Sequence, residues 1–468
     1  MGAGIGGYFK TFALSPAVDL AASIPSRRNP AKTIGLSAMT TLHKIAAAFA
    51  SLVVLTGWVS SGLAELNAQP AHPAGQTRTK RFSDTGKAAL SNQISSSVNR
   101  GDTPGVVALV VGRDGVLYQG AAGKLDVAHD VTMPVNAIFA IASMTKPVTS
   151  VAIMMLREEG KLGLDDAVSK YLAGFDNLRV ITKFNENDAT YETRAAKRPM
   201  TIRHLLTHTS GLGYDFSSAI EHRLMEKTKK SEWELPLLND PGDKWHYSAS
   251  TVVLGMIVEK ISGEPLEAYF QKHIFEPLGM LDTSYAVPLG KQSRVATKYH
   301  RMDGQWKELA QTRPIPATPV GPFRGDGGLY STAQDYGKFM QMLLNGGHLG
   351  QAKILSLRSV KMMGENNIGP IFVELQPVTQ PSLAKPFPLG AGHDKFGLGF
   401  QITSSDPRYA MFRSPGSMSW AGIYNTEFWI DPVQHIGGVM FMQVLPFYDD
   451  GALRTLRDFE KLVYQDLR

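Results

Sequence analysis

The first folded stretch of the chain shows two patterns of apolar and polar residues. Residues 83–98 have the pattern of a helix. Two strand-like apolar runs, residues 106–111 and 116–118, then flank Asp114-Gly115, a dipeptide typical of tight turns. The pattern therefore predicts a helix followed by a β-hairpin.

Strand-like runs return near the C-terminus, at residues 396–402, 424–430 and 436–442. Residues 453–467 then have the period of an amphipathic helix, and residues 160–360 are largely helical or irregular. Because strands lie at both ends of a helical middle, we expect one sheet whose members are distant in sequence. This favours one α/β unit with two lobes over two independent domains.

Composition agrees with a large globular chain: 468 residues, of which 43% are hydrophobic and 19% charged. Residues 1–64 contain five basic residues and one acidic residue, which supplies +4 of the net charge of +6. The remainder shows no basic patch with aromatics, so we expect no nucleic-acid partner. The absence of cysteine excludes disulfides, a cysteine nucleophile and thiolate metal sites.

The N-terminal segment resembles a targeting sequence. An apolar core at residues 45–55 follows a lysine, and the small residues Gly62 and Ala64 stand at cleavage-site spacing. We therefore expect a leader with a signal peptide over residues 1–64, a linker over 65–81, and a periplasmic or secreted protein. The alternative is a membrane anchor, which would associate the protein with a membrane if the leader is not cleaved.

Ser143 and Lys146 are spaced by three residues at the predicted start of a helix. Residues three apart share a helix face, and a serine hydroxyl becomes a good nucleophile only when a nearby base removes its proton. Pro147 fits near the first turn. A lysine serves as a base if desolvation lowers its pKa. The alternative is a helix-capping serine beside a surface lysine.

The same spacing occurs once more, at Ser382 and Lys385. These residues lie in a proline-rich stretch, 364–393, where a helix is not expected. We interpret that stretch as a long surface loop and this second match as chance.

Three short motifs occur in order along the chain: Ser143-x-x-Lys146, Tyr247-Ser248-Ala249 and Trp420-Ala421-Gly422. Together with residues 205–212 and 327–332 they resemble those of penicillin-recognising serine hydrolases, which include class C β-lactamases, D-Ala-D-Ala carboxypeptidases and family VIII carboxylesterases. The resemblance covers about residues 82–468. It implies an α/β (α+β) fold of the β-lactamase/transpeptidase type, with an antiparallel sheet flanked by terminal helices and a mainly helical lobe.

The resemblance also implies a mechanism. Ser143 would attack a carbonyl, while Lys146 and Tyr247 would handle protons as a coupled pair. The backbone N–H groups of Ser143 and Ile423 would form the oxyanion hole. Gly422 would allow close approach of the backbone to a substrate. The alternatives are a core aromatic at Tyr247 and a strand glycine at Gly422.

Two positions depart from the lactamase pattern. Ala249 stands where asparagine is common, and alanine cannot hydrogen-bond a substrate amide. Trp420 stands where lysine or histidine is common, as it does in family VIII esterases, and indole offers one N–H donor and an apolar face. Both changes favour less polar ester substrates, unless Trp420 is only a packing aromatic.

His208 does not indicate a Ser–His–Asp triad, because the chain has no Gly-x-Ser-x-Gly sequence. His204 and His208 have the spacing of a zinc pair, but the intervening residues lack the glutamate of HExxH. We therefore expect a structural histidine, no metal ion and no cofactor.

The sequence thus predicts a serine hydrolase, most simply a carboxylesterase that acts through an acyl-enzyme on short or medium acyl esters. The expected partner is a small-molecule ester or amide substrate. A β-lactamase, a D-Ala-D-Ala carboxypeptidase or a D-aminopeptidase is the first alternative. A non-catalytic binding protein that keeps the fold is the second, although intact Ser143, Lys146 and Tyr247 argue against it.

Overall fold

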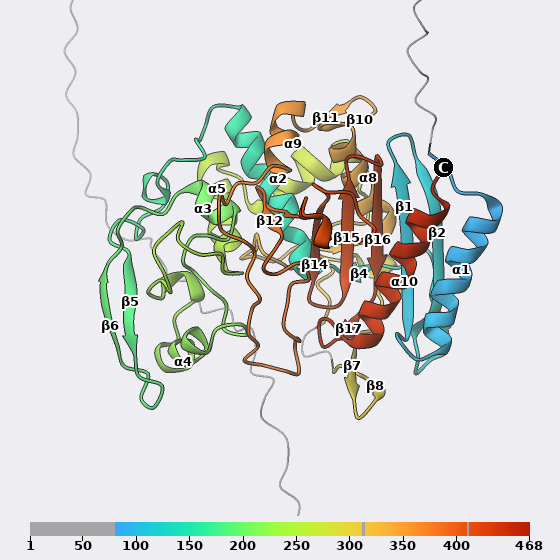
Figure 1. The fold of residues 1–468 in the computed structure, drawn as a ribbon, viewed down its shortest axis with the longest axis horizontal. Helices are drawn as coiled ribbons and strands as arrows, with labels where there is room; N and C mark the ends of the chain where they lie inside the picture. Colours follow the sequence, from blue (N-terminus) through green and yellow to red (C-terminus); the bar gives the residue numbers. More distant parts are fainter. Residues whose placement is uncertain (1–79, 311–313, 410) are drawn as a thin grey trace, which may run out of the picture. The chain divides into compact units, whose positions relative to one another are not determined.

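An eight-stranded antiparallel sheet lies at the centre of the structure, a computed structural model that describes residues 80–468 except 311–313 and 410 (Figure 1). The signal peptide predicted over residues 1–64, and all but the last two residues of the predicted linker, lie outside the described residues. The strands lie in the order β12-β13-β14-β15-β16-β1-β2-β3. Their bounds are β1 Gly105–Gly112, β2 Val116–Asp126, β3 Val131–Thr132, β12 Lys395–Phe396, β13 Gln401–Ile402, β14 Met418–Gly422, β15 Thr426–Asp431 and β16 Ile436–Phe441.

The sheet joins strands near the two ends of the described chain, as the sequence predicted. Strand β1 pairs with β16 from Val107↔Phe441 to Gly112↔Ile436 and with β2 on its other side. The predicted strand over residues 396–402 is wrong in detail, because the run folds back so that Lys395 pairs with Ile402. Gly399, whose φ of +96° suits glycine, lies in that turn.

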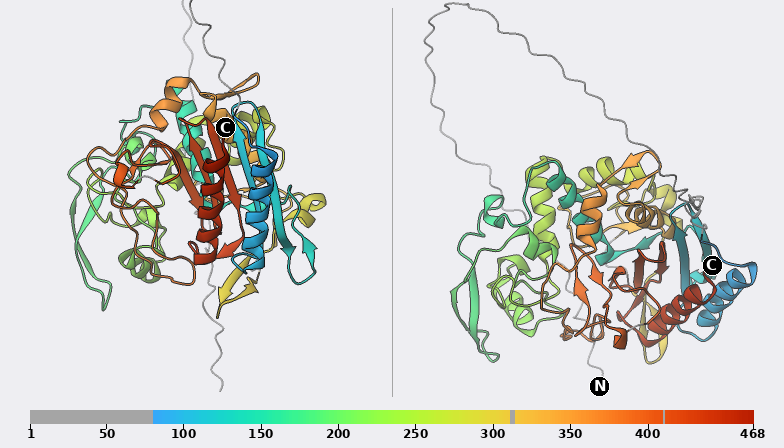
Figure 2. Two further views of the ribbon diagram at one scale, coloured as in Figure 1. Left: turned by 45° about the vertical axis from the view of Figure 1, so that its right-hand side comes forward. Right: turned by 45° about the horizontal axis from the view of Figure 1, so that its top comes forward.

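The terminal helices α1 (Asp84–Asn99) and α10 (Asp450–Asp466) lie side by side on one face of the sheet (Figure 2). Successive strand residues point to opposite faces, so β1 serves two cores. Its Val106, Ala108 and Val110 pack in the cluster that contains Leu456 and Phe459 of α10. Its other apolar residues pack on the opposite face.

Helices α2 (Thr145–Glu158) and α8 (Ala333–Leu344) belong to the core on that opposite face. Helix α2 lies between the sheet and the helical lobe, so it is buried on almost every side, Lys146 included. The lobe contains the helices α3 Ile202–Leu206, α4 Ala219–Thr228, α5 Ser250–Ser262, α6 Leu266–Phe270 and α7 Glu276–Leu278, and α9 Leu357–Met363 follows α8. The two-lobed fold expected from the sequence is therefore confirmed.

Further short strands lie outside the large sheet, and all but β4 and β17 fall within residues 160–360, where the sequence predicted mainly helical or irregular structure. They are β4 Phe139–Ala140, β5 Arg179–Phe184, β6 Tyr191–Ala195, β7 Tyr299–Met302, β8 Gln305–Glu308, β9 Tyr330–Ser331, β10 His348–Leu349, β11 Ala352–Lys353 and β17 Val444–Leu445. Strand β9 pairs with β4 and so brings residues 325–330 against the segment that carries Ser143. Within the described part of the chain, no helix is both long and apolar enough to cross a bilayer.

The proline-rich stretch 364–393 has no helix, as predicted, but it does not lie only on the surface. Val373, Gln376 and Phe387 are buried, with exposed fractions of 0–3%. The Gln376 amide donates to the Phe387 carbonyl, so the stretch folds back on itself. Its inner side therefore contributes to the core beside Tyr247.

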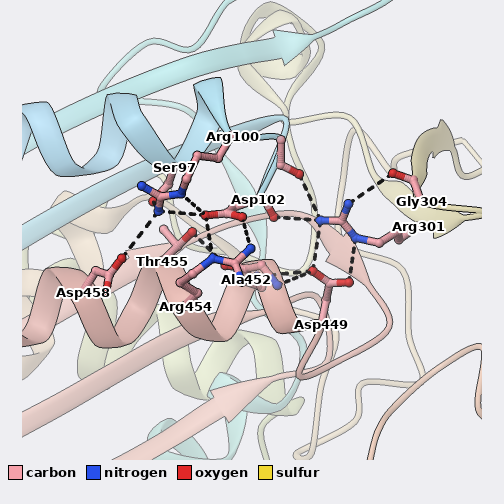
Figure 3. A network of polar contacts seen from close by, with 12 residues as sticks. Ser97, Arg100, Asp102, Arg301, Gly304, Asp449, Ala452, Arg454, Thr455 and Asp458 are labelled. Carbon is pink, nitrogen blue, oxygen red and sulfur yellow. Dashed lines mark hydrogen bonds and ion pairs between the residues drawn. The ribbon is translucent and has the colours of Figure 1, made fainter.

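A network of ion pairs fastens the start of α10 to the end of α1 (Figure 3). Asp449 caps α10 by accepting from the amides of Gly451, at 2.9 Å, and Ala452. It also binds the Arg301 guanidinium through both carboxylate oxygens, at 2.8 and 3.1 Å. The buried Asp102, just after α1, forms an ion pair with Arg454 of α10.

Candidate active site

Ser143 lies in a 3₁₀ turn (Ala142–Met144) that leads directly into α2. Ala142 has a φ of +44°, an uncommon conformation for alanine that often marks functional sites. The Ile141 amide donates to the Leu329 carbonyl at 3.0 Å, and the Tyr336 hydroxyl donates to the Met144 carbonyl at 3.0 Å. These bonds hold the turn from both sides. The N-terminus of α2 is a favourable place for negative charge on the Ser143 oxygen.

Lys146 Nζ lies 3.1 Å from Ser143 Oγ and donates to the Asp326 carbonyl at 2.9 Å. Only 2% of the lysine is exposed, and its amine lies 4.8 Å from the centre of the Tyr247 ring. No side chain caps α2, so the alternative of a capping serine beside a surface lysine is wrong. Burial lowers the pKa of Lys146 to about 7; the Asp326 carboxylate opposes this effect and the Arg324 guanidinium adds to it.

Tyr247 lies just before α5, and its ring packs 5.0 Å from His208 and 5.1 Å from Trp420. Burial raises the pKa of its hydroxyl well above the usual value, although hydrogen bonding to Ser143 and Trp420 works in the opposite direction. The phenol is therefore protonated at neutral pH, next to the Ser143 hydroxyl. The Tyr247 amide donates to Gln376 Oε1 at 3.2 Å, which ties the site to the proline-rich stretch.

Strand β14 carries the third motif to the site. Trp420 is 7% exposed, and its indole N–H has no partner of good geometry among the described residues, although it lies near the Tyr247 hydroxyl. A Cβ on Gly422 would stand 2.3 Å from the Ile141 carbonyl oxygen and 2.3 Å from Thr426 Oγ1. Glycine is thus required because the segment just before Ser143 crosses this strand.

The two amides predicted to form the oxyanion hole flank this crossing. Ser143 and Ile423 are both partly exposed. Apart from bonds within helices and strands, neither amide donates to another group in the described part of the chain. The structure thus brings Ser143, Lys146, Tyr247, Trp420, Gly422 and Ile423 together.

Ala249 differs from these residues, because it has no exposed surface. Its amide donates to the Gly213 carbonyl at 3.1 Å at the start of α5. It presents no polar group to a substrate, and a direct contact between Ala249 and a substrate remains a prediction.

His208 is a buried structural histidine, as predicted. Its Nδ1 accepts from the Ser248 amide at 3.3 Å, which leaves the ring proton on Nε2. Burial, together with the nearby Lys146 charge, holds the pKa of His208 well below its usual value, so the ring is neutral. His204 Nδ1 instead accepts from the Thr201 amide at the start of α3. No three possible metal ligands cluster anywhere in the described part of the chain.

Comparison with known proteins decides the family. The β-lactamase family profile matches residues 90–462. This chain belongs to the β-lactamase family. Family members and structural neighbours are hydrolases and acyltransferases built on the serine β-lactamase fold.

Several relatives of this β-lactamase family member extend over most of its length. Protein Rv1367c of Mycobacterium tuberculosis is 34% identical over 70% of this chain and 82% of its own length. A putative D-alanyl-D-alanine carboxypeptidase of Escherichia coli O157:H7 is 29% identical over 74% of this chain and 80% of its own length. The structure of a mutant of simvastatin synthase from Aspergillus terreus superposes with a TM-score of 0.68 at 25% identity, covering 82% of this chain and 95% of that one.

The sequence did not reveal three residues that surround the lysine. The Asp326 carboxylate accepts two hydrogen bonds from Arg324, at 2.9 and 3.0 Å, and one from the Tyr214 hydroxyl. Asp326 lies one residue before the stretch 327–332, which the sequence had marked as characteristic. The only sequence signal for these residues was Asp326 itself, which stands between two glycines and two residues after Arg324.

Proposed function

We propose that this family member is a serine hydrolase that forms an acyl-enzyme on Ser143 and acts on short or medium acyl esters. The observation that carries the proposal is the buried Lys146 amine, 3.1 Å from Ser143 Oγ and with a pKa of about 7. An ordinary lysine is protonated at neutral pH and cannot accept the serine proton. A lysine in this environment is neutral in about half of the molecules at pH 7.

In the proposed reaction, Ser143 Oγ bonds to the substrate carbonyl carbon while Lys146 takes the hydroxyl proton. The negative charge that develops on the carbonyl oxygen is stabilised by the amides of Ser143 and Ile423. The ester C–O bond then breaks, and the departing alcohol receives its proton from Tyr247, which Lys146 reprotonates. Water enters by the reverse sequence and releases the acid.

The side chains around Ser143 support an ester substrate. Trp420 replaces the cation that lactamases commonly use for a substrate carboxylate, and its indole adds an apolar wall. The Phe216 and Phe387 rings stack at 6.0 Å, and Phe387 packs 5.5 Å from Tyr247, so that side of the site is also aromatic. The nearby guanidinium, that of Arg324, is already bound by Asp326.

Two other reactions fit the same nucleophile. Cleavage of a lactam or of a D-alanyl peptide is the first, favoured by the similarity to the putative carboxypeptidase of E. coli. Acyl transfer to an alcohol is the second, favoured by the similarity to EstCE1, a hydrolase with promiscuous acyltransferase activity. Both proceed through the same acyl-Ser143 and differ only in the group that is cleaved or the group that accepts the acyl.

The deciding experiment compares p-nitrophenyl butyrate with a chromogenic cephalosporin, using the full chain and its Ser143→Ala variant. We expect fast ester cleavage, slow lactam opening, and loss of both in the variant. Addition of a primary alcohol, with the butyrate ester measured by chromatography, gives the share of acyl transfer. Dominant lactam opening would overturn the ester assignment, and unchanged turnover in Ser143→Ala would overturn the mechanism. No turnover and no acylation would favour a binding protein.

We also propose that the protein is exported to the periplasm or secreted, because of the apolar core at residues 45–55 followed by small residues. Expression of the full chain in E. coli, with fractionation and N-terminal sequencing, tests this. A periplasmic product that begins shortly after Ala64 is expected, and an unprocessed cytoplasmic product would contradict it.

A further inference from the structure

Asp326 contacts the Lys146 base through its main chain and the residues around that base through its side chain. Its main-chain carbonyl accepts a hydrogen bond from Lys146 Nζ at 2.9 Å. Its carboxylate, in a residue only 7% exposed, is gripped on both oxygens by the Arg324 guanidinium and accepts a further bond from Tyr214. The residue that positions the Lys146 amine is therefore itself held in place by its side chain.

The charges around Lys146 come from several segments. The titratable groups that face it are Ser143 on its own turn, His208 and Tyr214 before α4, Glu232 in the 3₁₀ turn Glu232–Glu234, Tyr247 before α5, and Arg324 and Asp326 before β9. Burial keeps both tyrosines protonated and the histidine neutral. Glu232 is buried, 3.9 Å from Arg324. The charges left to act on the amine are chiefly the Asp326 carboxylate and the Arg324 guanidinium.

We propose that Asp326 and Arg324 are positioning residues that hold the Lys146 amine against Ser143 and set its charge in opposite directions. The carboxylate stabilises the ammonium form, and the guanidinium stabilises the neutral amine that accepts the serine proton. This inference rests on the acyl-enzyme reaction proposed above. It assigns the adjustment of the Lys146 charge to the guanidinium of Arg324, a residue outside the three motifs.

The two roles have opposite consequences for pH dependence. Arg324→Gln removes a positive charge, so the pKa of Lys146 rises and the neutral amine forms only at higher pH. Asp326→Asn removes a negative charge, so the pKa falls and the reaction persists at lower pH. We expect each midpoint to move by about 0.5 to 1 pH unit, less than for a direct ion pair because the Asp326 carboxylate binds Arg324 and Tyr214 rather than the Lys146 amine itself. The double variant should return close to the original midpoint.

The experiment measures the rate at which an alkyl fluorophosphonate modifies Ser143 between pH 5 and 10. In this step Ser143 Oγ bonds to phosphorus, the P–F bond breaks, fluoride leaves with the electron pair, and Lys146 takes the serine proton. The rate reports on the base without depending on the identity of the ester or the alcohol. Intact-mass spectrometry identifies the adduct, and thermal unfolding checks that each variant folds.

A second arginine–aspartate pair offers a matched control. Arg408 binds Asp406 with the same spacing of two residues and through both oxygens, but Arg408 lies on the surface with 77% of its side chain exposed. Arg408→Gln and Asp406→Asn should leave the midpoint unchanged. If Asp326→Asn does not fold, Arg324→Gln alone still decides, since its midpoint must rise while that of Arg408→Gln stays unchanged.

Opposite shifts that cancel in the double variant would support the inference. Shifts in the same direction, or a loss of rate with no change in midpoint, would show that the pair is only structural and would overturn it while leaving the proposed function intact. Failure of the unaltered protein to be modified at Ser143 would overturn the proposed function, and this inference with it.

Discussion

Gly422→Ala tests most directly how the sheet places the nucleophile. The Ile141 carbonyl lies two residues before Ser143, and a new Cβ at position 422 would stand 2.3 Å from its oxygen. Ordinary contact needs about 3.4 Å, so the main chain would have to move by about 1 Å. Thr426 Oγ1, also at 2.3 Å, can rotate away, but a main-chain carbonyl cannot.

The size of the effect follows from that displacement. Overpacking of this kind costs about 1–3 kcal/mol of folding free energy. A shift of about 1 Å in a reacting group costs about 100-fold in rate. We therefore expect Gly422→Ala to lower kcat/KM for p-nitrophenyl butyrate about 100-fold, while the free energy of unfolding in urea falls by about 2 kcal/mol.

Gly437→Ala on β16 provides the matched control. It is also a buried glycine in the same sheet, but the three atoms nearest to its Cβ would all belong to the Met340 side chain, at 3.2 Å or more. This variant should lose less stability and keep its kcat/KM. If Gly422→Ala retains the activity and stability of the unaltered protein, the close crossing of β14 by the Ser143 segment is not what positions the nucleophile.

Three further predictions concern the base, the phenol and the fold. In the unaltered protein kcat/KM should rise with pH around a midpoint near 7, because the neutral Lys146 amine forms only above its depressed pKa. A flat profile from pH 5.5 to 9 would contradict this. Lys146→Met should lower kcat/KM about 1,000-fold. Tyr247→Phe should lower kcat/KM about 100-fold without moving the midpoint, since the raised pKa of the phenol keeps it protonated throughout, so a displaced midpoint would show that it titrates there. Asp449→Ala removes the α10 cap and an ion pair, and should cost about 1–2 kcal/mol in urea unfolding with kcat/KM unchanged. The exposed Asp458, 3.5 Å from Arg100, is its control, and equal losses in both variants would argue against the cap.

The sequence predicted the parts of the fold that depend on local periodicity. The apolar runs of β1, β15 and β16 and the amphipathic period of α10 can each be recognised within a short local stretch of sequence. The turn at Gly399 was missed because a run of apolar residues does not show where it reverses. The short hairpins in the middle are held by pairing with distant segments, such as β4 with β9, which no local pattern records.

The candidate site divides in the same way. Ser143 and Lys146 are neighbours on one turn, so their spacing alone predicts their contact, and the structure places the two groups 3.1 Å apart. Tyr247 and Trp420 required the family resemblance, because they reach the site from segments more than 100 residues away. The role of Asp326 could not be predicted from the sequence, because its contact with Lys146 uses a main-chain carbonyl, which any residue type can supply.

The loss of a cation at the third motif changes how the base must be tuned. A lysine or histidine at position 420 would place positive charge near the site and help to keep Lys146 neutral, whereas the Trp420 indole carries none. In this structure burial is the largest cause of the lowered pKa of Lys146, and the neighbouring cation that contributes is Arg324. The face toward a substrate can then be apolar without loss of an active base. A site arranged in this way suits neutral esters better than carboxylate-bearing lactams, which connects the substitution at position 420 to both the substrate and the Arg324–Asp326 pair.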